Sequence, residues 1–113
     1  MKFVLLTALV AALAVPAAFA STPTLNAIDG PGFTITVKQG TSKVKTLKAG
    51  TYIFKIADKS DTHNFHLTGP GVNKKTGVGF KGTTTWKLKL AAGKYKYVCD
   101  PHSAFMKGSF TVS

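Results

Sequence analysis

Apolar residues in this chain alternate with polar ones along one short segment after another. Beyond residue 20, no apolar pattern repeats with a helical period. The segments 33–37, 52–56 and 86–90 carry the clearest alternation, and 94–97 and 109–112 continue it. A period of two is that of a strand with one buried and one solvated face. Six or seven short strands at this spacing predict an all-β protein, a β-sandwich or barrel. The glycine-rich stretch 69–82 is expected to be a long loop containing a short helical turn.

The first 20 residues have the pattern of a secretory signal peptide. Lys2 provides a positive start, the stretch 3–15 is apolar, and Ala18-Phe19-Ala20 is a small-x-small cleavage site. The apolar stretch is too short to span a membrane. The sequence therefore predicts a signal peptide over 1–20 and one exported domain over 21–113, located in the periplasm or outside the cell.

The charge of the chain is strongly positive. It holds 15 lysines, no arginine and 4 aspartates, for a formal net charge of +11. Export and the absence of arginine argue against a nucleic-acid partner, because arginine is the usual bidentate reader of phosphate and guanine. The charge instead favours an acidic redox partner or an anionic membrane surface. The alternative is a solvated lysine coat that keeps a small monomer soluble.

Cys99 is the only cysteine, although exported proteins usually carry cysteines in disulfide pairs. It begins the spacing C-x2-H-x3-M, which continues with His102 and Met106. Thiolate, imidazole and thioether are soft or borderline ligands that select copper over magnesium, calcium or manganese. A buried, inert thiol is the alternative, but the neighbouring histidine and methionine favour a metal ligand.

A further imidazole ligand is expected from the stretch 63–66, which contains two histidines. In an extended chain, side chains two residues apart point to the same face. His63 then shares the apolar face of Phe65 and Leu67, so it is the predicted ligand. His66 lies with Asn64 and Thr68 on the polar, exposed face. Asn64 is predicted to tie this segment to the cysteine loop by hydrogen bonding.

These motifs resemble those of the cupredoxins, in particular the small plastocyanin, pseudoazurin and amicyanin group. The resemblance is strongest at His63-Asn64, along 93–99 and at Cys99-Asp100-Pro101-His102. It implies a Greek-key β-sandwich or barrel of about seven to eight strands. It also implies one copper ion per chain, changing between Cu(I) and Cu(II). The implied ligands are His63, Cys99, His102 and Met106. Three residues separate His102 from Met106, whereas plastocyanin-like loops usually have four and amicyanin-like loops two; a backbone carbonyl is the alternative axial ligand.

The resulting functional hypothesis is a one-electron carrier between a redox donor and a redox acceptor outside the cytoplasm. A copper scavenger or delivery protein without redox shuttling is the main alternative. An interaction sandwich with incidental histidines is a third. An enzyme is least favoured, since one cysteine and three histidines are too few to build the further copper centres of an oxidase or a nitrite reductase.

Overall fold

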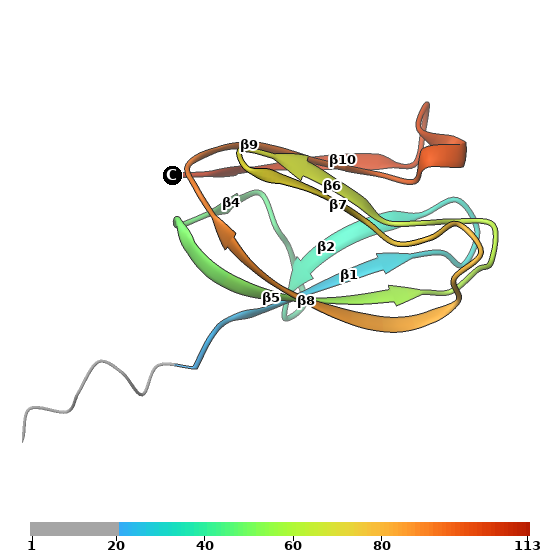
Figure 1. Cartoon of the computed structure of the whole chain (residues 1–113), viewed down its shortest axis with the longest axis horizontal. Helices are drawn as coiled ribbons and strands as arrows, with labels where there is room; N and C mark the ends of the chain where they lie inside the picture. Colours follow the sequence, from blue (N-terminus) through green and yellow to red (C-terminus); the bar gives the residue numbers. More distant parts are fainter. Residues whose placement is uncertain (1–20) are drawn as a thin grey trace, which may run out of the picture.

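The computed structural model describes residues 21–113, which form two five-stranded sheets packed face to face (Figure 1). The predicted signal peptide, residues 1–20, lies outside the described residues. Sheet A has the order β3-β2-β1-β5-β8 and sheet B the order β4-β10-β9-β6-β7. The strands of sheet A are β1 (Thr24–Asp29), β2 (Ile35–Gln39), β3 (Ser42–Lys43), β5 (Gly50–Asp58) and β8 (Gly82–Leu90). Those of sheet B are β4 (Thr46–Leu47), β6 (His66–Gly69), β7 (Val72–Lys75), β9 (Gly93–Val98) and β10 (Lys107–Val112).

Most neighbouring strands run antiparallel, but β1 pairs with β5, and β4 with β10, in parallel. The chain crosses from one sheet to the other several times, between β5 and β6 and again between β7, β8 and β9. The predicted all-β sandwich is confirmed. Ten strands are present within residues 21–113, more than the seven to eight expected, partly because β3 and β4 are only two residues long.

The alternating segments place one set of side chains between the sheets. In β5, for example, Tyr52, Phe54 and Ile56 are buried. Sheet B contributes aromatic rings to the same core, where Tyr95 stacks on Phe110 with 5.3 Å between ring centroids. Burial of such apolar surface, at roughly 25 cal/mol per Å², is the main stabilising contribution to a domain of this size.

Two local predictions need correction. The stretch 69–82 holds no helical turn but contains β7, which pairs with β6 around the turn Pro70-Gly71. Gly71 has φ +69°, the conformation that glycine adopts easily in a tight turn. Strand β2 begins at Ile35 rather than at residue 33, and Phe33 is 62% exposed in the preceding loop. Strand β1 was also not predicted.

Gly69 lies where a side chain has no room. A Cβ atom there would overlap the ring of Tyr95, which Phe110 holds in place by stacking. We expect Gly69→Ala to lower the free energy of unfolding by about 1–3 kcal/mol, as overpacking usually does. The matched control is Gly77→Ala, because a Cβ at Gly77 meets no atom within 4 Å. Urea denaturation of both variants measures the difference, and equal stability of the two would contradict the packing argument.

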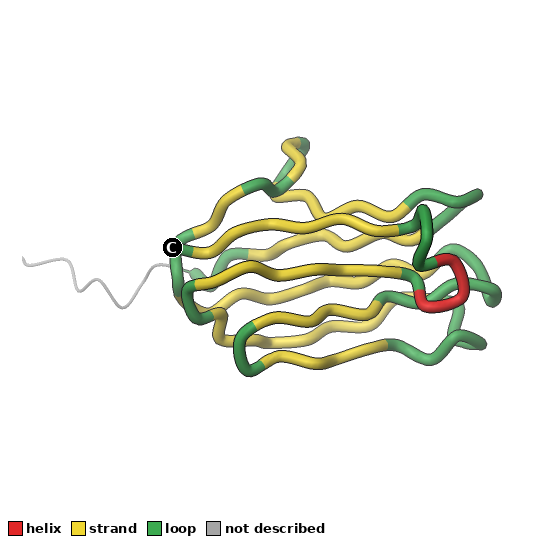
Figure 2. Tube along the Cα trace, turned by 90° about the horizontal axis from the view of Figure 1, so that it is seen from above, coloured by secondary structure: helices red, strands yellow, loops and turns green. Residues whose placement is uncertain are grey.

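The end of the sandwich opposite the C-terminus carries the cysteine loop. Its 3-10 helix, η2 (Asp100–His102), lies at this end between β9 and β10 (Figure 2). Among residues 21–113, no helix is both long and apolar enough to cross a membrane. The candidate site is therefore at one tip of the sandwich, held by loops that rigid strands anchor.

Candidate metal centre

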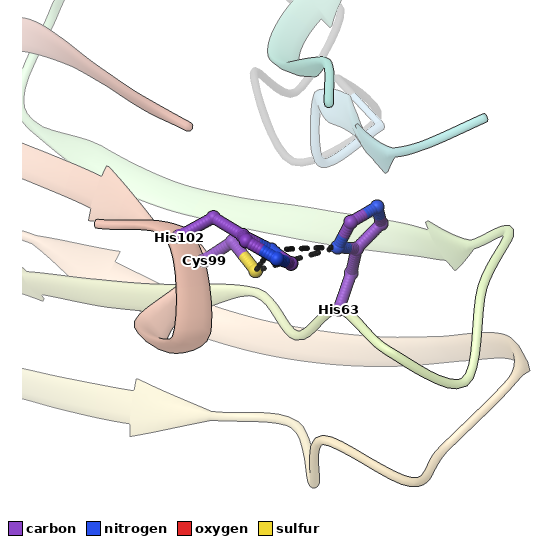
Figure 3. A group of neighbouring side chains, drawn as sticks. All are labelled: His63, Cys99 and His102. Atoms are coloured by element: carbon purple, nitrogen blue, oxygen red, sulfur yellow. Dashed lines mark hydrogen bonds between the residues drawn. The ribbon is translucent and has the colours of Figure 1, made fainter. Parts of the chain in front are cut away.

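Three potential ligand atoms from distant parts of the sequence converge at this tip (Figure 3). Cys99 follows directly after β9, His102 ends η2, and His63 lies in the connection between β5 and β6. His63 Nδ1 is 3.2 Å from His102 Nδ1, and Cys99 Sγ is 3.7 Å and 3.5 Å from these two nitrogens. Cys99 and His63 are almost fully buried, with exposures of 0% and 3%. The structure thus brings three of the four predicted ligand residues together.

The size of this triangle fits a metal ion. A point about 2 Å from all three atoms lies inside it, near the roughly 2.0–2.3 Å that separate a first-row metal ion from imidazole nitrogen and thiolate sulfur. The three ligand atoms therefore surround one position at bonding distance for such an ion.

A hydrogen bond on the side away from Cys99 and His102 fixes the orientation of the His63 ring. Its Nε2 lies 2.7 Å from the carbonyl oxygen of Gly32 and can only donate to it, so the ring proton belongs on Nε2. Nδ1, which faces Cys99 and His102, is then left with a lone pair. A hydrogen bond of this kind commonly fixes the tautomer of a metal-binding histidine. The Gly32 carbonyl was not predicted, because a backbone acceptor in a loop leaves no signal in the sequence.

The cysteine loop is closed by its own backbone. Cys99 N–H donates to the Met106 carbonyl over 3.0 Å, and Met106 N–H donates to the His102 carbonyl over 2.8 Å. Pro101 stands at the start of η2, where its fixed φ favours the turn. Met106 is 1% exposed. The loop therefore holds Met106 at the same tip as the other three predicted ligand residues, with its side chain buried.

Asn64 links this loop to the segment that carries His63. Its Oδ1 accepts from Asp100 N–H over 2.7 Å, and its Nδ2 donates to Asp100 Oδ2 and to the Thr76 carbonyl. The predicted tie between the two segments is confirmed. The predicted exposure of Asn64 on a polar face is wrong, since it is 1% exposed. Strand β6 begins only at His66, so the alternation rule does not apply to residues 63–65.

His66 has a different environment from His63. Its Nδ1 is 2.9 Å from Asp100 Oδ1, and its Nε2 is 2.7 Å from Asn73 Oδ1. Partial burial opposes the charged form of the ring, but these hydrogen bonds and the Asp100 charge outweigh it and raise the pKa of His66. Both ring nitrogens face acceptors and carry protons in this cationic form. In its protonated form His66 pairs with Asp100, and both of its ring nitrogens point to hydrogen-bond acceptors rather than to the three converging ligand atoms.

Aromatic rings surround the outer edge of the site. Phe33 packs edge-on against His102, with 5.0 Å between centroids, and Phe105 lies 5.3 Å from Phe33. Both phenylalanines are largely exposed, at 62% and 59%, whereas His102 is partly buried between them and the loop. The tip therefore presents an apolar surface directly above one of the predicted ligands. The alternation of 33–37 predicted that Phe33 lies in a strand, but it lies in the loop before β2.

The donor set fits copper better than other common metals. Two imidazoles and a thiolate in a triangle, with a thioether available as a weak axial ligand, match the preferences of copper. A structural zinc site normally closes with a fourth thiolate, imidazole or carboxylate. Within residues 21–113, His63, Cys99 and His102 form the one cluster of three or more such groups.

The fold is a small two-sheet sandwich, and a His-Cys-His cluster lies at one of its tips. Together they place the protein in a class of metal-binding β proteins. The cupredoxin-like domain family matches residues 5–112 of this chain. Amicyanin-alpha of Methylorubrum extorquens is 32% identical over 119 aligned positions, which cover 99% of each chain. The chain belongs to the cupredoxin-like family, as its sequence motifs predicted, and copper is the cofactor that this family and this donor set share.

Solved structures of rusticyanin have the same fold. Reduced rusticyanin matches with a TM-score of 0.59 and 23% identity, covering 82% of this chain and 81% of rusticyanin. Rusticyanin from Thiobacillus ferrooxidans gives a TM-score of 0.57 and 24% identity, covering 82% and 79%. At this identity the similarity establishes the architecture, and the assignment of the site rests on the residues of this chain.

Proposed function

We propose that this protein is an exported one-electron carrier with a single type 1 copper site. The ligands are His63, Cys99 and His102, with Met106 in the weaker axial position. The observation that carries the proposal is the convergence of three ligand atoms within 4.8 Å of one another, two of them on nearly fully buried residues. Membership of the cupredoxin-like family supports it. Bound copper would supply a one-electron couple between Cu(I) and Cu(II).

The surrounding residues suit electron transfer rather than catalysis. Gly32 and Asn64 fix the ligand segments from behind, so the ligand atoms need little rearrangement when the charge of the site changes. The core and Met106 exclude water from below. His102 is the ligand nearest the surface, and the exposed rings of Phe33 and Phe105 form an apolar area on which a partner can dock.

The test of this function is a redox titration of the copper-loaded protein. We expect one copper per chain, intense visible absorption in the oxidised state, and reversible loss of that colour on adding one electron equivalent. Exchange of copper with a competing chelator should be slow. Irreversible reduction with fast exchange would instead indicate a copper scavenger or delivery protein, and the absence of stoichiometric copper would indicate an interaction domain.

The two histidines of the 63–66 segment should respond differently to substitution. His63→Gly should open the ligand set, weaken copper binding and alter the visible spectrum, and added imidazole should partly restore it. His66→Gln should preserve colour and stoichiometry, because the His66 ring points to Asp100 and Asn73. Copper titrations followed by visible absorption compare the variants. The reverse pattern would exclude His63 as the ligand.

The surface charge supports an acidic partner. Of the 4 aspartates, Asp29 and Asp58 are buried and Asp100 is paired with His66. Asp61 is exposed and has no such partner among the described residues. Lysines line a groove of about 400 Å³ on the outer face of sheet A and one of about 360 Å³ on that of sheet B. These lysines are Lys38, Lys55 and Lys59 in the first groove and Lys94, Lys96 and Lys107 in the second.

Electron transfer to an acidic partner should therefore depend on salt. The Debye length shortens from about 30 Å at 0.01 M to about 10 Å at 0.1 M, so the association rate should fall over this range. Stopped-flow rates with an acidic and a basic redox protein measure the effect, which should have opposite signs for the two. Replacing the three lysines of one groove by glutamine identifies the face that is used. If both redox proteins show the same salt dependence, the lysines do not steer a partner and only keep the protein soluble.

A further inference from the structure

Two of the four aspartates lie side by side in the interior. Asp29 ends β1 and Asp58 ends β5, and they are direct partners in the parallel pairing of these strands. Their exposures are 0% and 1%. Burying carboxylates without cations is costly, and it is unexpected in a chain so rich in lysine. The pair therefore calls for a physical explanation.

The hydrogen bonding of the pair lacks a donor. Asp58 Oδ1 accepts from Ser60 N–H over 3.0 Å. Both oxygens of Asp29 and Oδ2 of Asp58 have no partner among the described residues when the two groups are ionised. Burial above all, then a hydrogen bond with Asp58 and the Asp58 charge, raise the pKa of Asp29 to about 8, and they outweigh the lowering effect of the Lys59 backbone N–H. One proton held between the carboxyl groups would supply the missing donor and remove the repulsion.

Other charged groups do not compensate the pair. Opposite Asp29 on β2 is Ile35, and opposite Asp58 on β8 is Gly82. Lys59 and Asp61, in the segment that follows β5, are both exposed. His63, the buried titratable residue of that segment, directs its ring nitrogens to Gly32 and to the metal cluster. A proton shared within the pair is thus the available means of neutralisation.

The pair stands at the base of the two segments that orient His63. The turn 30–34 begins directly after Asp29 and carries the Gly32 carbonyl, whereas the segment 59–65 begins directly after Asp58 and carries the His63 ring. The segments touch at Gly30, where an added Cβ would lie 3.3 Å from Lys59 Cβ and 3.5 Å from the His63 ring. The Lys59 N–H also donates to the Asp29 carbonyl over 2.9 Å, and a hydrogen bond between the two carboxyl groups would reinforce this tie and the spacing between the ring and its backbone acceptor.

We propose that Asp29 and Asp58 share one proton and act as positioning residues for His63, keeping its Nε2–H on the Gly32 carbonyl and its Nδ1 directed at the metal site. The metal-related part of this inference rests on the proposed function, in which His63 is a ligand. The shared proton and the ring orientation are properties of the metal-free protein, so both can be tested without copper.

The first experiment measures the pH dependence of unfolding. A carboxyl group has an ordinary pKa of 3.8 in the unfolded chain, so the folded protein holds one extra proton between about pH 4 and 8. Its stability should then fall as the pH rises, by up to tenfold in the folding equilibrium constant per pH unit. Asp58→Asn supplies a permanent N–H donor and removes the Asp58 charge, so it should weaken this dependence, while the part that comes from burial of Asp29 remains. Asp61→Asn, at an exposed aspartate, is the matched control and should behave like the wild type.

Comparing the wild type with Asp58→Asn also cancels the contributions of other titrating groups to the pH dependence of stability. His66, whose raised pKa makes stability fall with rising pH as well, is unchanged in both proteins and cancels in the difference. Direct observation of the carboxyl carbons by NMR complements the measurement. At pH 6 the two groups of the wild type should together retain one proton. Two fully ionised carboxylates, or equal pH dependence of wild type and Asp58→Asn, would overturn the proposal.

The second experiment follows the His63 Nε2 proton by NMR in the metal-free protein. Asp29→Ala removes the tie and should increase exchange of this proton with solvent at least tenfold, whereas Asp58→Asn should keep it close to the wild-type rate. If Asp29→Ala does not fold, wild type and Asp58→Asn are compared above pH 8, where only the wild type loses its donor. If the exchange rate of the His63 Nε2 proton is unchanged, the aspartate pair has only a general structural role and does not position His63. Failure to bind copper, with these results intact, would refute the proposed function alone.

Discussion

Cys99→Ser should abolish the visible colour of the copper-loaded protein. The intense absorption of a type 1 site comes from charge transfer between the thiolate and Cu(II), and Cys99 is the only thiol in the chain. A serine hydroxyl is a harder ligand that does not replace thiolate for copper. We also expect a large loss of copper affinity, because one corner of the ligand triangle is removed. Absorption and copper stoichiometry of the purified variant provide the measurement.

Two controls make this result specific. Ser103→Ala changes an exposed residue of the same loop and should leave the colour intact. The metal-free Cys99→Ser protein should still unfold cooperatively, because serine is close in size to the cysteine that it replaces in the core. A Cys99→Ser protein that remains coloured would show that the metal is held elsewhere.

Copper should also stabilise the folded protein strongly. The ligand atoms come from two segments 36 residues apart and converge only in the native state. A ligand that binds only the native state, at a thousandfold excess over its dissociation constant, raises the free energy of unfolding by about 4 kcal/mol. Each kcal/mol corresponds to about 4–8 °C in Tm for a domain of 60–100 residues. Thermal unfolding of metal-free and copper-loaded protein measures the shift.

The control for this stabilisation is the same pair of measurements on His63→Gly, in which the ligand set is incomplete. Copper should raise its Tm much less. Binding of copper to Cys99 in the unfolded chain would reduce the effect in the wild type, but it would reduce it equally in the variant. Equal melting temperatures for metal-free and loaded wild type would contradict a tight, preformed site.

Much of the fold and of the candidate site could be predicted from local sequence patterns. Alternation identified the long strands because one face of each sheet is buried and the other solvated. The spacing from Cys99 to Met106 identified the loop because these residues lie on one short turn. His63 was distinguished from His66 by a strand rule, although residues 63–65 are all buried and β6 begins only at His66.

What could not be predicted depends on contacts between distant residues. The Gly32 carbonyl and Phe33 reach the site from the loop before β2, and a loop residue shows no periodicity that would reveal its partner. Asn64 can be buried because both the oxygen and the nitrogen of its amide form hydrogen bonds. One partner is Asp100 in the cysteine loop, 36 residues away. The Asp29–Asp58 pair arises from a parallel strand pairing that sequence spacing does not report.

The edge strands of the two sheets have features that oppose edge-to-edge association. Strand edges expose unpaired backbone groups to which strands of other molecules can add, and short strands or lysines at an edge oppose this. The edge strands β3 and β4 are only two residues long, whereas β7 and β8 carry lysines. Some of the positive charge therefore protects the sandwich from edge-to-edge association whatever partner it meets. We expect lysine-to-threonine changes in β8 to promote fibril formation even where electron transfer is unaffected.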